Sequence, residues 1–211
     1  MKTLSMAILT AAAAGAVIVD RVAITAGNRM ISDSEIDQRI RLTAFESGRQ
    51  PAFDPSARKK AADRLIDEKL IENEMDVGHY PRLTPEKSQG LLSGYAKLYF
   101  KGDNKAMEAN LASYGLTVDD LQQDLAREQD LLTFVSLRFR PSVQVTEQDV
   151  RDYFQKNIQP KLPPGSGGID DYRSQIETDI TTTRADAEVN SWLKEQRKRY
   201  RIEYLEKDLA P

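Results

Sequence analysis

VDRVAITAGNRMISDSEIDQRI, residues 19–40, contains two short strand patterns followed by the start of a helix. Apolar and polar residues alternate up to Gly27, many of them β-branched, and Gly27-Asn28 is a turn dipeptide that leads into RMIS. Ser32, with Glu35 three residues later, forms a capping box, which marks the beginning of a helix. The stretch therefore predicts a β-hairpin over residues 17–32 that continues directly into an α-helix.

The same helix-start chemistry recurs along the chain and predicts about five helices after the hairpin. The signals are Asp54-Pro55, Thr84-Pro85, Thr117 with Asp120, and Thr146 with Asp149. The helix after Pro55 carries apolar residues at near-helical spacing, so one of its faces is expected to be buried. These residues are Ala61, Ala62, Leu65, Ile66, Ile71 and Met75.

The C-terminal part contains further helical patterns at residues 169–180 and 187–200, and then the alternating run RIEYL at residues 201–205. Trp192 is expected to anchor the closing helix in the core. A lone final strand needs a partner, and the other strand-like sequence is the N-terminal hairpin. The predicted fold class is mostly α, a helical module whose small hairpin is joined by the C-terminal strand, with residues 17–211 forming a single domain.

Composition excludes several classes of function. The chain of 211 residues is 40% hydrophobic, which is too apolar for a disordered chain, and its net charge of −3 comes without a basic block for nucleic acid. There is no cysteine and only one histidine, His79, which lies in a turn-like link without a metal-ligand spacing. Acidic pairs occur at predicted helix starts, Asp119-Asp120 and Asp170-Asp171, where capping is their expected role. We therefore expect no catalytic residues, no metal site and no cofactor.

The N-terminus predicts export. Lys2 precedes an apolar run from Leu4, and Ala14-Gly15-Ala16 has the small-x-small form that precedes a signal-peptidase cleavage site. Residues 1–16 are therefore interpreted as a signal peptide for the periplasm. An uncleaved membrane anchor is the alternative, although the run is short and rich in alanine.

Several segments follow one another in an order typical of one protein family. The opening VDRV at residues 19–22, the turn Asn28 and the helix entry at residues 31–37 are followed by AADRLIDEKLIENEM, DDLQQDLAREQDLLTFVSLRFRPSVQVTEQDVRDYF and SWLKEQRKRYRIEYL. Together they resemble the SurA-type periplasmic chaperones, in their SurA N-terminal domain, over most of the chain after residue 16. The resemblance implies a helical chaperone module that binds unfolded envelope or outer-membrane proteins.

The chain departs from that family at QPKLPPGSGG, residues 159–168. In SurA-like proteins the helix that corresponds to residues 146–157 is followed by parvulin-type prolyl isomerase domains, whereas here only this loop precedes the closing helix. A parvulin domain is far longer than this loop and carries histidines that the loop lacks. The resemblance therefore implies the chaperone module alone, without isomerase activity.

Client binding needs exposed apolar surface in a concave setting. The segment GYAKLYFKGDNKAMEANLASYG, residues 94–115, concentrates such side chains around a polar break, which predicts a helical hairpin with an apolar inner surface. The candidate client-binding residues are Tyr95, Leu98, Tyr99, Phe100, Met107, Leu111 and Tyr114. The alternative is that these side chains form ordinary core.

These observations predict an ATP-independent holding chaperone that binds unfolded clients in an apolar helical cradle. The alternative is a dedicated module that docks one secreted or envelope protein. A homodimer with facing cradles is a variant of either function.

Overall fold

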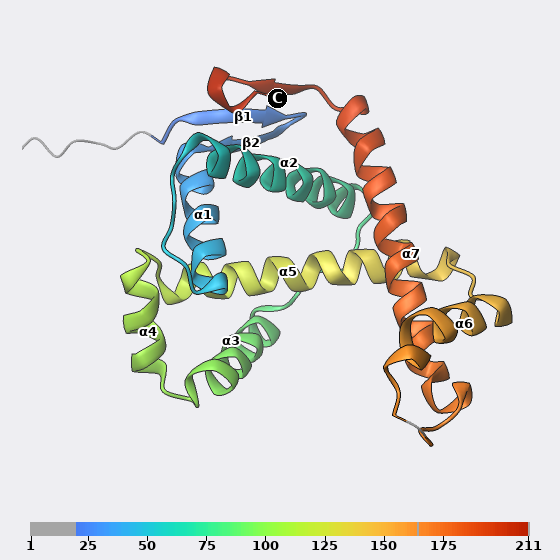
Figure 1. Ribbon diagram of the computed structural model, residues 1–211. Helices are drawn as coiled ribbons and strands as arrows, with labels where there is room; N and C mark the ends of the chain where they lie inside the picture. The colour runs from blue at the N-terminus through green and yellow to red at the C-terminus, as the bar shows by residue number, and fades with distance from the viewer. Residues whose placement is uncertain (1–19, 164, 211) are drawn as a thin grey trace, which may run out of the picture.

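The computed structural model describes residues 20–163 and 165–210 and confirms a mostly α fold (Figure 1). The predicted signal peptide, residues 1–16, and the start of the predicted hairpin before Asp20 lie outside the described residues. The elements are β1 (Val22–Ala26), β2 (Arg29–Ser32), α1 (Asp33–Ser47), α2 (Pro55–Val77), α3 (Pro85–Phe100), α4 (Asn104–Ser113), α5 (Val118–Arg138), α6 (Glu147–Tyr153), α7 (Ile169–Arg199) and β3 (Ile202–Tyr204).

The two ends of the described chain meet in one antiparallel sheet with strand order β2-β1-β3. Ile24 of β1 pairs with Ile31 on one side and with Tyr204 on the other. The turn between β1 and β2 needs a glycine, because Gly27 has φ +62° and an added Cβ would lie 2.8 Å from the Tyr200 ring. The predicted pairing of the hairpin with the C-terminal strand is thus confirmed.

The first hydrophobic cluster lies between this sheet and helices α1 and α2. Ala61, Ala62, Leu65 and Ile66 face the sheet from α2, as their spacing predicts, and Leu209 closes the cluster from the C-terminal turn. The last two predicted core residues of α2 belong to another cluster, in which Ile71 and Met75 pack against α5 and α7. One face of α2 therefore joins the two clusters.

Trp192 is central to the cluster that joins α2, α5 and α7. Its ring lies 5.6 Å from Phe134 and 6.0 Å from Phe139, measured between ring centroids. Trp192 therefore anchors α7 against the C-terminal end of α5, as predicted from the sequence.

The predicted helix starts are confirmed by side-chain hydrogen bonds. Ser32, Thr117 and Thr146 each accept a hydrogen bond from the backbone N–H of the third helical residue, and the side chain of that residue accepts one from the backbone N–H of the cap. Asp54 and Thr84 cap α2 and α3, each with proline in the first turn. Asp119-Asp120 and Asp170-Asp171 lie in the first turns of α5 and α7, where their charges complement the helix dipole.

The Pro/Gly segment is the bend of a helical arm. A π-helical turn and a 3₁₀ turn follow α6, and the chain then reverses into α7, which is continuous over 31 residues and spans about 46 Å at 1.5 Å per residue. Residues 181–186, which carry no helical prediction, are thus part of this helix. The arm has its own core, built around Val150, Ile176 and Ile180. Figure 1 shows α6 and the first half of α7 projecting away from the other helices.

A search of the described residues finds no helix with the length and apolarity that a membrane span requires.

Candidate functional site

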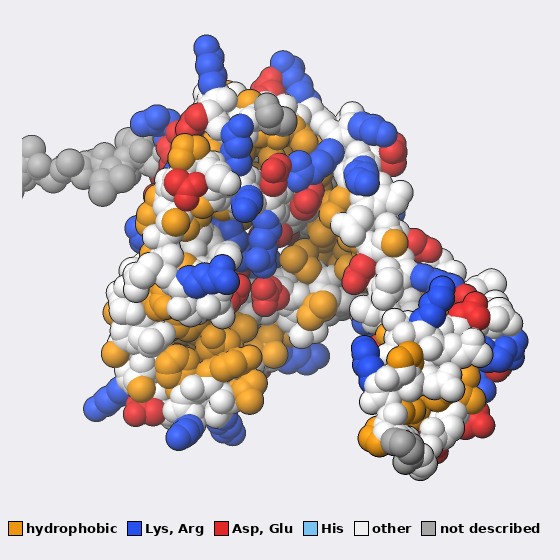
Figure 2. Space-filling model, viewed as in Figure 1, with side chains coloured by type: hydrophobic (Ala, Val, Ile, Leu, Met, Phe, Trp, Pro, Cys, Tyr) orange, Lys and Arg blue, Asp and Glu red, His pale blue; other side chains and the backbone are white. Residues whose placement is uncertain are grey.

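A hollow of about 570 Å³ lies where the C-terminal end of α1 meets α3, α4 and α5, and we call it the aromatic groove. Figure 2 shows hydrophobic side chains gathered over these helices, with acidic side chains along the border of the patch. The groove is lined by Phe45, Glu46, Gly48, Tyr95, Tyr99, Phe100, Asn110, Leu121, Leu125 and Glu128.

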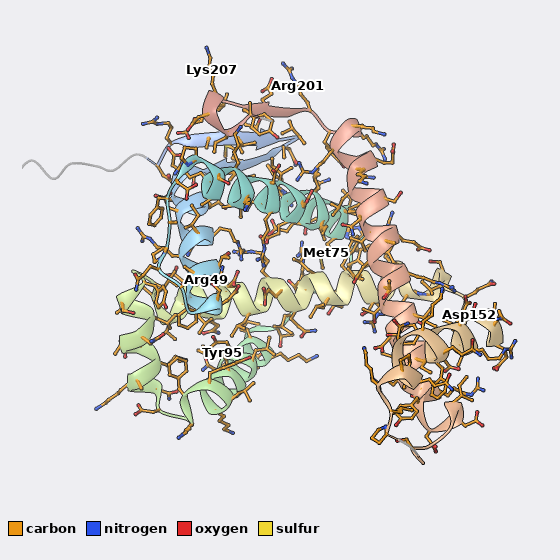
Figure 3. All side chains as sticks on the ribbon, viewed as in Figure 1. Arg49, Met75, Tyr95, Asp152, Arg201 and Lys207 are labelled. Carbon is orange, nitrogen blue, oxygen red and sulfur yellow. The ribbon has the colours of Figure 1, made fainter. Side chains whose placement is uncertain are left out.

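Tyr95 holds the aromatic side chains of the groove together. Its ring centroid lies 4.5 Å from that of Tyr99, 6.2 Å from that of Phe45 and 6.4 Å from that of Phe100. Figure 3 shows Tyr95 on α3, in the space between α3 and α5. Burial raises the pKa of Tyr95 to about 12, and the neighbouring Tyr99, Glu46 and Glu128 act in the same direction. The phenol is therefore neutral at physiological pH and can offer both an apolar face and a hydroxyl.

The structure separates the seven predicted client-binding residues into two groups. Tyr95, Tyr99 and Phe100 line the groove, and Tyr99 is 64% exposed. Leu98 is 73% exposed but does not line the groove, and Tyr114 packs edge-on against Phe45 beside it. This group provides surface on which another chain can lie.

The other two predicted residues are core. Met107 and Leu111 are 2% and 0% exposed, and they join α4 to α1, α3 and α5 in one hydrophobic cluster. They face inward because the short helix α4 uses its single apolar stripe to pack against α3 and α5. Met107 and Leu111 therefore support the groove from behind and are not part of its lining.

Only three of the ten residues that line the groove were predicted from the sequence. Phe45 and Glu46 come from the end of α1, and Leu121, Leu125 and Glu128 come from α5. The spacing of the α5 residues by four and three positions predicts a shared helix face, but no local signal says that this face lies opposite Tyr95. That relation depends on how α3 and α5 pack.

Glu46 and Glu128 form the acidic border of the groove, and the buried carboxylate of Asp124 lies beside them. One oxygen each of Glu46, Asp124 and Glu128 lies within 4.8 Å of the others. Burial, together with the negative charges of Asp124 and Glu128, raises the pKa of Glu46 to about 7 against the opposing effect of Arg64. The three carboxylates are therefore close enough to influence one another's protonation.

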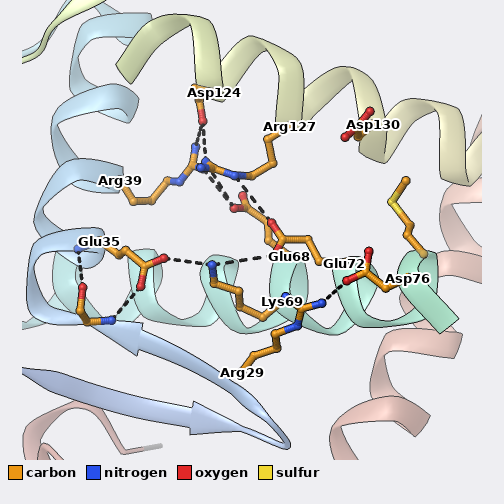
Figure 4. Close-up of polar contacts among 12 residues, drawn as sticks. Arg29, Glu35, Arg39, Glu68, Lys69, Glu72, Asp76, Asp124, Arg127 and Asp130 are labelled. Atoms are coloured by element: carbon orange, nitrogen blue, oxygen red, sulfur yellow. Dashed lines mark hydrogen bonds and ion pairs between the residues drawn. The ribbon is translucent and has the colours of Figure 1, made fainter. Parts of the chain in front are cut away.

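Arginines from α1, α2 and α5 neutralise the inner part of this border, and Figure 4 shows Arg39 on α1 and Arg127 on α5 beside Asp124. Arg39 is 2% exposed and lies between Glu68 at 3.0 Å and Asp124 at 2.9 Å. Arg127 lies 3.1 Å from Asp124, and Arg64 lies 3.2 Å from Glu128. The network is continuous from α1 through α2 to α5, so it fixes the wall on which the groove is built.

His79 lies in the turn after α2 and is exposed, with φ +52°. Among the described residues, the carboxylates of Glu46, Asp124 and Glu128 lie close enough together to bind one metal ion. Two of these carboxylates already contact arginines, so a metal ion would compete with ion pairs that hold the helices together.

A comparison with protein-family models finds no family that matches this chain, and a comparison with curated proteins finds no relative that matches it. The chemistry of the groove is therefore the main guide to function. An open hollow with aromatic walls and an acidic border can hold an apolar side chain and orient polar groups around it.

Proposed function

We propose that this protein is an ATP-independent holding chaperone that binds unfolded envelope proteins in the aromatic groove. The observation that carries the proposal is an open groove whose aromatic wall includes Tyr99. The Tyr99 side chain is 64% exposed, and its described ring contact is with Tyr95 on the same helix. Unfolded clients offer hydrophobic side chains that such a wall can cover.

The size of the groove suits weak and reversible binding. Burying about 400 Å² of client surface at about 25 cal/mol per Å² contributes roughly 10 kcal/mol before the costs of association and of ordering the client are subtracted. Most of that gain is offset, so the client is released without an energy source. This balance supports a holding function.

Two further features support the proposal. The predicted signal peptide would deliver the chain to the periplasm, where outer-membrane proteins pass in an unfolded state. The resemblance to SurA-type chaperones covers the first half of α1 and most of α5, which contribute to the groove, while the arm bends at residues 159–168, where that family carries an isomerase domain. The proposed activity therefore does not include proline isomerisation.

The test is light scattering from a denatured outer-membrane β-barrel protein that is diluted into buffer without ATP, with and without residues 17–211. We expect suppressed aggregation, and the same result with an unrelated barrel protein. If both barrels aggregate as they do alone at every ratio of the two proteins, the holding function is wrong. Binding to a single secreted protein, with no effect on unrelated clients, would favour the dedicated docking module.

A matched pair of variants assigns the activity to the groove. Tyr99→Ser removes an exposed aromatic side chain from the groove wall, while Leu132→Ser removes a side chain on α5 that is 61% exposed and lies outside the groove lining. We expect Tyr99→Ser to weaken suppression and Leu132→Ser to leave it unchanged. Equal effects of the two substitutions would contradict the assignment.

A further inference from the structure

The aromatic groove has two chemically different borders. Tyr95 and Tyr99 on α3 present aromatic faces, and Glu46 at the end of α1 and Glu128 on α5 place carboxylates in the same lining. In Figure 2 acidic side chains lie beside the hydrophobic patch that covers this part of the molecule. A ligand that fills the groove therefore meets both kinds of surface at once.

The negative charge at this border is only partly balanced. Asp124 contacts Arg39 and Arg127, and Glu128 contacts Arg64. In the part of the chain that the structure describes, Glu46 has no cation within 4.0 Å of its carboxylate, although it lies within 4.8 Å of the other two carboxylates. One further positive group can therefore be accommodated beside Glu46 without displacing an existing ion pair.

We infer that the groove selects client segments in which a lysine or arginine lies within a few residues of an aromatic side chain. This inference rests on the proposed function, because it specifies which unfolded segments the groove takes. The aromatic side chain of the client packs against Tyr95, and the cationic group lies between the Glu46 carboxylate and the exposed ring of Tyr99. Cations bind both to carboxylates and to the faces of aromatic rings.

Fluorescence anisotropy with short labelled peptides tests the inference on the full chain. The peptides share two aromatic residues and differ at one position, which is Lys, Gln or Glu. Since a cation–π or ion-pair contact contributes about 1 kcal/mol at such a partly exposed site, the Lys peptide should bind about fivefold more tightly than the Gln peptide, and the Glu peptide more weakly still. High salt should reduce the difference.

Two variants test whether Glu46 is the source of the preference for the Lys peptide. Glu46→Gln removes the carboxylate that has no ion pair, so the Lys and Gln peptides should then bind with nearly equal affinity. Glu177→Gln removes an exposed carboxylate on α7, far along the chain and outside the groove lining, and should keep the full preference. Loss of the preference in both variants would indicate a general charge effect and overturn the inference.

The outcomes separate this inference from the proposed function. Equal binding of the three peptides, combined with suppressed barrel aggregation, would overturn the charge preference and leave the holding function intact. A preference that persists in Glu46→Gln would also overturn the assignment. No binding of any peptide, together with unsuppressed aggregation, would overturn both proposals.

Discussion

The guanidinium of Arg39 on α1 lies 3.0 Å from the carboxylate of Glu68 on α2, and both side chains are almost completely buried. The same guanidinium lies 2.9 Å from Asp124 on α5, so one cation connects three helices. Burying a charge costs desolvation free energy, and this cost is offset only while each charge keeps its partners.

Arg39→Met should therefore destabilise the fold strongly. The substitution leaves Glu68 and Asp124 buried with fewer cationic partners, and breaking a buried ion pair in this way costs about 3 kcal/mol or more. Lys60→Met is the control, since Lys60 is exposed on α2 and a surface substitution changes stability by about 0.5 kcal/mol or less. Urea unfolding measures both, and similar midpoints for the two variants would contradict the role of the network.

The last turn of the described chain provides a second pair of variants. Leu209 is 3% exposed and belongs to the cluster beneath the sheet, whereas Leu205 is 58% exposed. Leu209→Ala should cost about 2–3 kcal/mol because it leaves a cavity between the sheet and α2. Leu205→Ala should stay close to the wild-type stability. If thermal unfolding shows the same shift for both, Leu209 does not contribute to the core as described.

Glu46 should make stability depend on pH. Because its pKa is raised from 4.5 to about 7 in the folded state, the folded state holds the proton more tightly than the unfolded state. The contribution of Glu46 is therefore fully favourable below about pH 4.5 and is lost as the pH rises through about 7. The groups that face it are Asp124 and Glu128 on α5, Arg64 on α2 and Tyr95 on α3.

Glu46→Gln removes this dependence, so its stability relative to the wild type should increase between pH 5 and pH 8. The Glu46 side chain is still partly exposed to solvent, and screening limits the gain to less than about 1 kcal/mol. Glu177→Gln controls for the loss of one negative charge. If the difference in the free energy of unfolding between Glu46→Gln and the wild type is constant across this range, the neighbouring groups do not shift the pKa of Glu46.

The bend of the helical arm should tolerate extra residues. Gly165 and Ser166 are exposed, and each doubling of loop length costs only about 0.6 kcal/mol of loop-closure entropy. A flexible Gly/Ser insertion between them should therefore lower stability by less than about 1 kcal/mol. The same insertion between Thr182 and Thr183 interrupts α7 and should be far more damaging. Equal losses in chemical denaturation would show that the bend is a fixed part of the core.

Much of the secondary structure could be predicted from short-range signals. Ser32, Thr117 and Thr146 mark the starts of their helices in the sequence, because capping involves side chains and amides only three residues apart. The continuity of α7 through residues 181–186 could not be predicted in this way, because β-branched and polar residues lower local helix propensity. Ile180, just before that segment, packs in the core of the arm, and Ala185, within it, packs in the cluster with α2 and α5, so tertiary contacts hold the segment in the helix.

The candidate site could be predicted only in part. The aromatic residues of α3 are visible in the sequence, and three of them do line the groove. Met107 and Leu111 have the same apolar character, yet they are buried, because composition does not tell which face of α4 meets its neighbours. The acidic border was not predicted, since Glu46 lies 78 residues before Asp124 and 82 residues before Glu128.

The sequence by itself determined where α1, α2, α3, α5 and α6 begin, that the chain is mostly α, and that its final strand needs the N-terminal hairpin as a partner. These features depend on capping, on hydrophobic spacing and on the unpaired edges of strands, which act locally or leave few alternatives. Only the tertiary structure decided which apolar side chains are core and which line the groove, and brought Glu46 beside Asp124 and Glu128. The reason is that burial and electrostatic coupling depend on distances between helices, and those distances follow from packing the whole chain.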